Sequence, residues 1–285
     1  MAKIIINGVT YAYEITGQGD PLLLLHGFTG SSQSWAEHVP ALAQHYRVIT
    51  LDILGHGRSA SPADPARYTM EKVAEDVTAV LQQLEAREGH NTRQSPLANL
   101  SLLGYSMGGR LALYFAVHYP QLLRALILES ASPGLETEHA RAERRDRDHA
   151  LAERIERDGM VPFVDYWETL PLWASQQQLA PQQRAALRQQ RLQNNPVGLA
   201  NSLRGMGTGA QPSLWPSLAD LSLPVLLLVG ELDEKFVSIN RRMHNLLLNS
   251  QLEIIAGAGH TVHEERPYRF QQHIHNFLEG LNRGD

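Results

Sequence analysis

The sequence contains no cysteine among its 285 residues, which excludes disulfide bonds, a thiolate nucleophile and a metal site with cysteine ligands. It has no apolar run that approaches the roughly 18 residues of a membrane span, and the apolar residues 4–6 are too few for a secretory signal. Basic charge is not in excess, because the formal net charge is −5, so nothing indicates binding to nucleic acid or to a membrane surface. We therefore expect a cytoplasmic, soluble protein that is a monomer or a weak homo-oligomer.

Short, wholly apolar runs recur along the chain, and several end at a glycine. Such runs are typical of strands that are buried on both faces of a parallel sheet. After an opening hairpin at residues 3–16, the expected strands are residues 22–25, 47–51, 99–103, 123–128, 225–229 and 252–255. Apolar residues at helical spacing lie between them, for example in residues 73–84 and 270–281. The alternation predicts an α/β fold with a mostly parallel central sheet flanked by helices.

Two segments depart from this alternation. Residues 131–209 contain no strand pattern, but they contain charged helical runs at 139–157 and 181–193. Strand patterns resume afterwards, so we expect a helical cap inserted into a core made of residues 1–130 and 210–285. The polar residues 87–98 are expected to form a surface loop.

The sequence GYSMG at residues 104–108 follows an expected strand and opens a helical pattern, which is the setting that a G-x-S-x-G nucleophile elbow requires. The tight turn is expected to expose the Ser106 hydroxyl and to direct the backbone N–H of Met107 toward a developing anion. A second N–H donor is needed from the loop after the strand at 22–25, and Phe28 is expected to supply it. His26, in the same loop, is expected to brace the loop rather than to take part in chemistry.

A serine hydroxyl needs a base, and the base needs a carboxylate that orients it; both are expected after later strands. Among 13 histidines, His260 follows the last expected strand, where the histidine of this fold belongs, with His263 as the alternative. Asp233 follows the preceding strand and can hold the imidazole in the required tautomer, with Glu231 as the alternative. The chain order Ser, Asp, His is the order of α/β hydrolases.

The core motifs resemble the α/β-hydrolase superfamily across nearly the whole chain. Further segments, from about residue 20 to the C-terminus, resemble the 2-succinyl-6-hydroxy-2,4-cyclohexadiene-1-carboxylate synthases of menaquinone and phylloquinone biosynthesis. These segments are LHGFTGS (25–31), DILGHGRS (52–59), GYSMGGR (104–110), ESASPGL (129–135), RAER (141–144), FVDYWETLPLW (163–173), SLRGMGTG (202–209), GELDEKF (230–236) and AGAGHTVHEERP (256–267). The likeness within residues 131–209 weighs most, because caps differ most among related enzymes.

The resemblance implies a lyase rather than a hydrolase. The family's substrate is a cyclohexene with a succinyl group, a ring carboxylate and an enolpyruvyl ether; removal of a ring proton expels pyruvate as the diene forms. Ser106 then acts as a base without an acyl-enzyme, supported by Asp233 and His260. The N–H groups of Phe28 and Met107 stabilise the enolate-like charge.

A substrate with three carboxylates calls for arginines, which bind carboxylates in a bidentate manner. The resemblance implies Arg110 and Arg144 for this role, and more loosely Arg191, with Tyr105 and Trp167 lining the pocket. The competing interpretation is strong for the cap: most of its arginines are expected to face water, and Trp167 fits a place in the cap core nearly as well.

Two other functions remain open. A serine hydrolase acting on esters or carbon–carbon bonds would use the same three residues, and a small-molecule sensor without turnover would keep the same fold. The arginines and the charged cap argue against both. No metal or cofactor is implied, because residues 263–265 lack the second histidine of H-E-x-x-H, and the chain has no P-loop.

Overall fold

The computed structural model describes residues 1–87 and 99–283, and within them an eight-stranded sheet has the order β1-β2-β4-β3-β5-β6-β7-β8. The first two pairs in this order are antiparallel and the remaining pairs are parallel. The strands are β1 (Ala2–Ile6), β2 (Val9–Thr16), β3 (Pro21–Leu25), β4 (Arg47–Leu51), β5 (Ser101–Tyr105), β6 (Ala125–Glu129), β7 (Val225–Gly230) and β8 (Ser250–Ile255). The predicted α/β fold with a mostly parallel sheet is confirmed.

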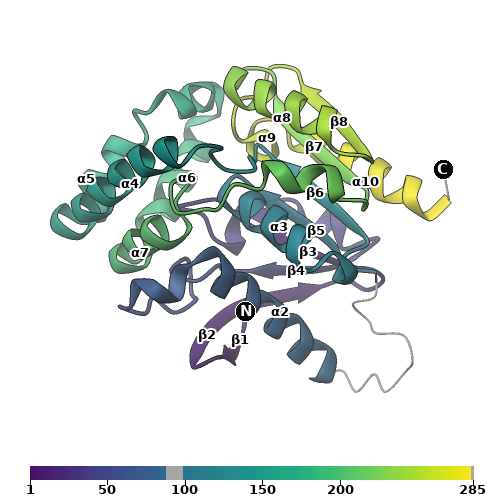
Figure 1. Ribbon diagram of the computed structural model, residues 1–285, viewed down its shortest axis with the longest axis horizontal. Coiled ribbons are helices and arrows are strands. Elements are labelled where there is room, and N and C mark those ends of the chain that lie inside the picture. The colour runs from purple at the N-terminus through teal and green to yellow at the C-terminus, as the bar shows by residue number, and fades with distance from the viewer. Residues whose placement is uncertain (88–98, 284–285) are drawn as a thin grey trace.

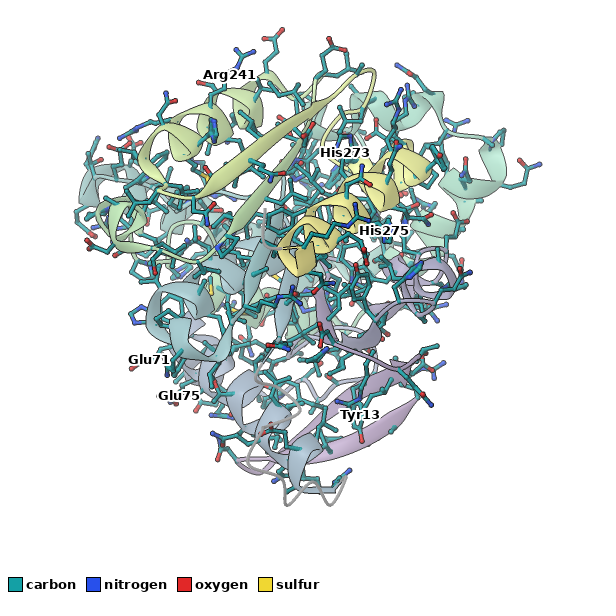
Figure 2. The ribbon with its side chains drawn as sticks, turned by 90° about the vertical axis from the view of Figure 1, so that its right-hand side faces the viewer. Tyr13, Glu71, Glu75, Arg241, His273 and His275 are labelled. Atoms are coloured by element: carbon teal, nitrogen blue, oxygen red, sulfur yellow. The ribbon has the colours of Figure 1, made fainter. Side chains whose placement is uncertain are left out.

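Helices cover both faces of this sheet. In β3, Leu23 and Leu25 join the apolar cluster of α2 (Met70–Arg87) and α3 (Met107–His118). Leu22 and Leu24 join the cluster of α10 (Pro267–Arg283) on the other face, because successive strand residues point to opposite sides. Figure 2 marks α10 by His273 and His275, and α2 by Glu71 and Glu75. Both faces are therefore apolar, which accounts for the continuous apolar runs.

The remaining core helices are short or lie near the sheet ends. They are α1 (Val39–Leu42), α8 (Glu234–Leu246) and α9 (Val262–Glu265), with the 3-10 helices η1 (Ser32–Trp35), η2 (Pro65–Tyr68), η3 (Pro120–Leu122) and η5 (Trp215–Asp220).

Two strands are shifted toward the C-terminus relative to their predicted ranges. The runs 99–103 and 123–128 were expected to form strands, whereas β5 and β6 begin at Ser101 and Ala125. Gly104 and Tyr105 continue the ladder and pair with Leu128 and Glu129. Gly104 ends the apolar run but not the strand pairing, because a glycine can adopt the extended backbone of a strand.

Residues 138–206, which lie between β6 and β7, are mostly helical and lie together at one side of the sheet (Figure 1). It contains α4 (Glu138–Asp158), α5 (Met160–Trp167), η4 (Pro171–Gln178), α6 (Pro181–Leu192) and α7 (Pro196–Met206). An apolar cluster of its own joins α4, α5 and α7, with Ile155, Phe163 and Leu199 fully buried.

A surface loop was predicted for residues 87–98, and residues 88–98 of it lie outside the described residues. None of the helices in the described ranges combines the length and the apolar character needed to cross a bilayer.

Candidate active site

The turn between β5 and α3 holds Ser106 in a strained conformation. Its φ of 50° and ψ of −107° lie in a region that non-glycine residues rarely adopt. The glycines around it allow this geometry: a Cβ at Gly104 would lie 2.3 Å from the carbonyl oxygen of Gly108, and a Cβ at Gly108 would lie 2.3 Å from that of Leu25. The turn therefore has the form of a nucleophile elbow.

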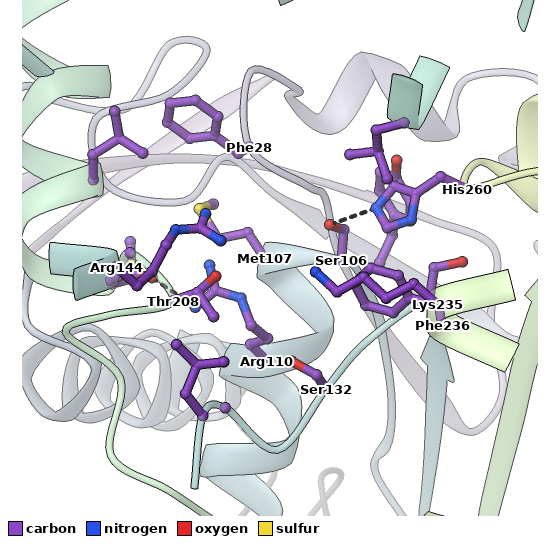
Figure 3. A pocket seen from close by; sticks show the side chains of 18 of the residues that line it. Phe28, Ser106, Met107, Arg110, Ser132, Arg144, Thr208, Lys235, Phe236 and His260 are labelled. Atoms are coloured by element: carbon purple, nitrogen blue, oxygen red, sulfur yellow. Dashed lines mark hydrogen bonds between the residues drawn. The ribbon is translucent and has the colours of Figure 1, made fainter. Parts of the chain in front are cut away.

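Ser106, His260 and Asp233 are brought together at the carboxyl ends of the strands. Figure 3 shows the contact between Ser106 and His260. The Nε2 atom of His260 lies 3.0 Å from the Ser106 Oγ, and its Nδ1 atom lies 2.6 Å from Asp233 Oδ2. The carboxylate holds the proton on Nδ1, so Nε2 is left as an acceptor for the serine hydroxyl. Asp233 is also the N-cap residue of α8, where its side chain accepts a hydrogen bond from the Phe236 N–H at 3.4 Å. This arrangement can increase the basicity of the serine oxygen.

The two alternative residues are engaged elsewhere. Glu231 accepts a hydrogen bond from the Gly257 N–H at 3.0 Å. His263 is buried, and its Nδ1 lies 2.8 Å from the carboxylate of Glu129, which is fully buried at the end of β6. Burial alone would lower the pKa of His263, but the charge and hydrogen bond of Glu129, together with the charges of Glu264 and Glu265, raise it above its usual value.

The loop that carries Phe28 is fixed by the ring of His26, as expected from the sequence. His26 donates from Nδ1 to the Gly27 carbonyl oxygen at 2.8 Å, and its Nε2 accepts from the Ile53 N–H at 3.0 Å. Burial lowers the pKa of His26 to about 4. The Met107 N–H belongs to the first residue of α3, so it has no acceptor within the helix. Phe28 and Met107 line the same cavity as Ser106.

This cavity has a volume of about 210 Å³ and lies between the sheet edge and the helices of residues 131–209. Four of the residues predicted to bind substrate line it: Tyr105, Arg110, Arg144 and Trp167. Tyr105 is anchored by its hydroxyl, which lies 3.3 Å from Thr261 Oγ1.

Both cavity arginines have protein partners. Arg110 donates from Nη1 to the Met206 carbonyl oxygen at 2.7 Å and to Gln211 Oε1 at 3.0 Å. Burial, and then the charge of Arg144, lowers the pKa of Arg110 to about 10. Arg144 donates from Nε to Asp148 Oδ1 at 2.8 Å. The remaining N–H groups of these two guanidinium ions are the donors that a carboxylate ligand can use.

Arg191, the fifth predicted substrate-binding residue, is not among the residues that line the cavity. It is buried, and it donates to Glu168 Oε1 at 2.8 Å and to Gln176 Oε1 at 2.9 Å. Its guanidinium carbon lies 5.1 Å from the ring centre of Trp173, which does line the cavity. Arg191 thus lies behind Trp173 and is paired with Glu168, and its role in substrate binding stays a prediction.

Lys235, Phe236 and Trp173 also line the cavity; they lie in the segments GELDEKF and FVDYWETLPLW, but no role was predicted for any of them from the sequence. The available signal was position: Lys235 and Phe236 directly follow Asp233 at the end of a strand, where the functional residues of such sheets gather. Within residues 1–87 and 99–283, no three or more His, Asp or Glu side chains are grouped to hold a metal ion.

The chain is similar to known proteins in both sequence and structure. Residues 20–267 match the alpha/beta hydrolase fold family. The chain is 45% identical over 277 residues to the "Putative 2-succinyl-6-hydroxy-2,4-cyclohexadiene-1-carboxylate synthase" of Bacillus subtilis, covering 96% of this chain and 97% of the relative. Its structure resembles that of MenH from S. aureus with a TM-score of 0.86, at 37% identity over 94% of this chain and 97% of the other. It also resembles a malate-bound thermophilic esterase from Thermogutta terrifontis, with a TM-score of 0.81 and 30% identity over 98% and 97%.

Proposed function

The chain belongs to the alpha/beta hydrolase fold family and, within it, to the 2-succinyl-6-hydroxy-2,4-cyclohexadiene-1-carboxylate synthases, and on this premise we propose its reaction and its active-site roles. The enzyme is a carbon–oxygen lyase of menaquinone biosynthesis. It converts 2-succinyl-5-enolpyruvyl-6-hydroxy-3-cyclohexene-1-carboxylate into pyruvate and the cyclohexadiene. The observation that carries this assignment is the 45% identity to the Bacillus subtilis relative. The alignment covers 96% of the chain, a length that takes in most of the residues around the cavity.

The reaction begins with loss of the proton from ring carbon 2, which lies beside the succinyl ketone. The electron pair forms a double bond between carbons 2 and 3, and the existing double bond shifts to carbons 4 and 5. The bond from carbon 5 to the enolpyruvyl oxygen breaks, and the departing group takes up a proton to become pyruvate. Water is not a reactant, so the elimination requires a base and not a nucleophile.

Ser106 is the proposed base. Its own proton passes to His260 Nε2 over the 3.0 Å hydrogen bond, and the Ser106 oxygen accepts the ring proton. Asp233 stabilises the resulting imidazolium through the 2.6 Å contact to Nδ1. The same relay can return a proton to the departing enolate, which gives pyruvate and leaves the three side chains as they began.

Charge that develops on the ketone oxygen during proton removal needs hydrogen-bond donors. We assign this role to the backbone N–H groups of Phe28 and Met107, which border the cavity beside Ser106. Their positions are set in advance, the first by the His26 brace and the second by the start of α3, so little reorganisation is needed when the charge appears.

Arg110 and Arg144 are the proposed carboxylate ligands, with Tyr105 and Trp167 as apolar walls for the ring. Residues 131–209 act as the cap of this site, and residues 1–130 and 210–285 form the core. In this proposal Arg191 contributes indirectly, by holding Trp173. A tricarboxylate does not cross membranes unaided, which supports a cytoplasmic location.

The test is an assay of the enolpyruvyl cyclohexene substrate, generated in situ, in which diene formation and pyruvate release are followed together. We expect equal amounts of both products from the wild type, and a kcat at least about 1000-fold lower for Ser106→Ala, since it removes the base. Ser132→Ala removes another cavity hydroxyl, but one without a histidine partner, and should stay within about tenfold of the wild type.

Three other outcomes would contradict the proposal. Activity of Ser106→Ala within about tenfold of the wild type would remove Ser106 from the role of base. Absence of pyruvate release by the wild type, with rapid cleavage of simple esters, would favour the hydrolase alternative. Binding of the substrate with no more than a single turnover would favour a sensor.

A further inference from the structure

In addition to Arg110 and Arg144, a third cationic side chain, that of Lys235, lines the cavity. Lys235 lies in the first turn of α8, two residues after Asp233, and its side chain is exposed. Among the described residues, no carboxylate or carbonyl oxygen pairs with its ammonium group, which lies 5.6 Å from the ring centre of Phe236. Unlike the two arginines, Lys235 has all its donors available for a ligand.

The local structure gives no reason for a cation at this position. The first turn of a helix carries partial positive charge, which favours acidic residues and disfavours lysine. The chain also has only three lysines, and the other two, Lys3 and Lys72, lie on β1 and α2 and do not line the cavity. A lysine at an unfavourable helix position, facing a cavity and without an acidic partner among the described residues, therefore points to a ligand.

In Figure 3 the side chain of Lys235 enters the cavity from the side of Phe236 and His260 and its ammonium group reaches past Ser106, whereas Arg110 and Arg144 enter from the opposite side. A ligand with several carboxylates can therefore contact cations that come from both sides. Because Lys235 is exposed while Arg110 is buried, Lys235 stands nearer to solvent.

We propose that Lys235 binds the carboxylate of the enolpyruvyl group and then of the pyruvate that departs. This assignment rests on the proposed lyase function. An ammonium group suits the role because it is a compact, strongly hydrated charge that releases a carboxylate more readily than a bidentate guanidinium does. The arginines hold the other carboxylates, so that the diene product stays bound while pyruvate leaves.

The experiment compares the wild type with Lys235→Met, which removes the charge but keeps an unbranched stem. We expect kcat/KM to fall about 10-fold to 100-fold, as for the loss of one charge-assisted hydrogen bond. Product inhibition by added pyruvate should weaken by at least about tenfold, whereas the melting temperature should change little, because among the described residues the ammonium group has no acidic partner and its contact with the Phe236 ring, at 5.6 Å, is weak. Lys235→Arg should recover most of kcat/KM. Lys72→Met, the matched control, should leave both kcat/KM and the inhibition constant of pyruvate unchanged.

The outcomes separate this inference from the function on which it rests. If the wild type releases no pyruvate, the lyase function itself fails. If it does, and Lys235→Met leaves both kcat/KM and pyruvate inhibition unchanged, the role of Lys235 is refuted. A lower kcat/KM with unchanged pyruvate inhibition assigns Lys235 to a different carboxylate and overturns the proposal.

Discussion

The brace formed by His26 makes the stability of the protein sensitive to acid. Its ring is fully buried, with Nε2 accepting from the Ile53 N–H and Nδ1 donating to the Gly27 carbonyl oxygen. Protonation of Nε2 would place one N–H against another in this buried site. Burial accordingly lowers the pKa of His26 from 6.5 to about 4. The unfolded chain therefore takes up this proton at a higher pH than the folded protein does.

The sign and size of the effect follow from linkage. Since the folded pKa is lowered, the stability that neutral His26 contributes is complete above pH 6.5 and is lost as the pH falls toward 4. At pH 5 the loss amounts to about 2 kcal/mol relative to pH 7.5. His56, whose ring centre lies 5.2 Å from that of His26, acts in the same direction, because burial and then the His26 charge lower its pKa to about 3.

The measurement is urea unfolding, followed by tryptophan fluorescence, of the wild type and His26→Gln at pH 7.5 and pH 5. The glutamine cannot titrate in this range, so the wild type should lose about 2 kcal/mol more than the variant on acidification. His139→Gln is the control, because the His139 side chain is 85% exposed; its loss should match that of the wild type. Losses that agree within about 0.5 kcal/mol for wild type and His26→Gln would refute the reasoning.

Two further substitutions test the elbow and the loop of His260. Gly108→Ala places a Cβ against the carbonyl oxygen of Leu25, so thermal unfolding should show that the free energy of unfolding falls by about 3 kcal/mol or more. Gly280→Ala is the control: no atom lies within 4 Å of its new Cβ, so this change should be neutral or stabilising. Glu265 accepts from the backbone N–H groups on both sides of His260, so Glu265→Gln should lower kcat about tenfold with little change in KM; an unchanged kcat would show that the loop holds its shape without the carboxylate.

The fold could be predicted because the strands are buried on both faces. An apolar run as short as Leu22 to Leu25, followed at once by a glycine-containing turn, is too brief for a buried helix and suits a buried strand. The strand–helix alternation then favours parallel pairing. The ends of strands are a weaker prediction. Tyr105 and Glu129 extend β5 and β6 because they pair with each other, and no local pattern announces that contact.

The positions of Ser106, Asp233 and His260 were predictable for a related reason. Each follows a parallel strand, and the carboxyl ends of parallel strands meet at one edge of the sheet. Arg110 could also be predicted, since it lies one helical turn after Ser106 on α3 and shares its face.

The cap arginines obey no such rule, because their availability depends on contacts between distant segments. Arg144 and Arg191 both lie in polar helical segments between residues 131 and 209, yet only Arg144 borders the cavity. Arg191 is neutralised by Glu168, which lies 23 positions earlier and approaches only after α5 and α6 have packed together. Lys235 presents the reverse case, a cation next to Glu234 in sequence that has no acidic partner among the described residues. Whether a charge is paired or available to a ligand is a tertiary property, and for this reason the cations were the least predictable part of the site.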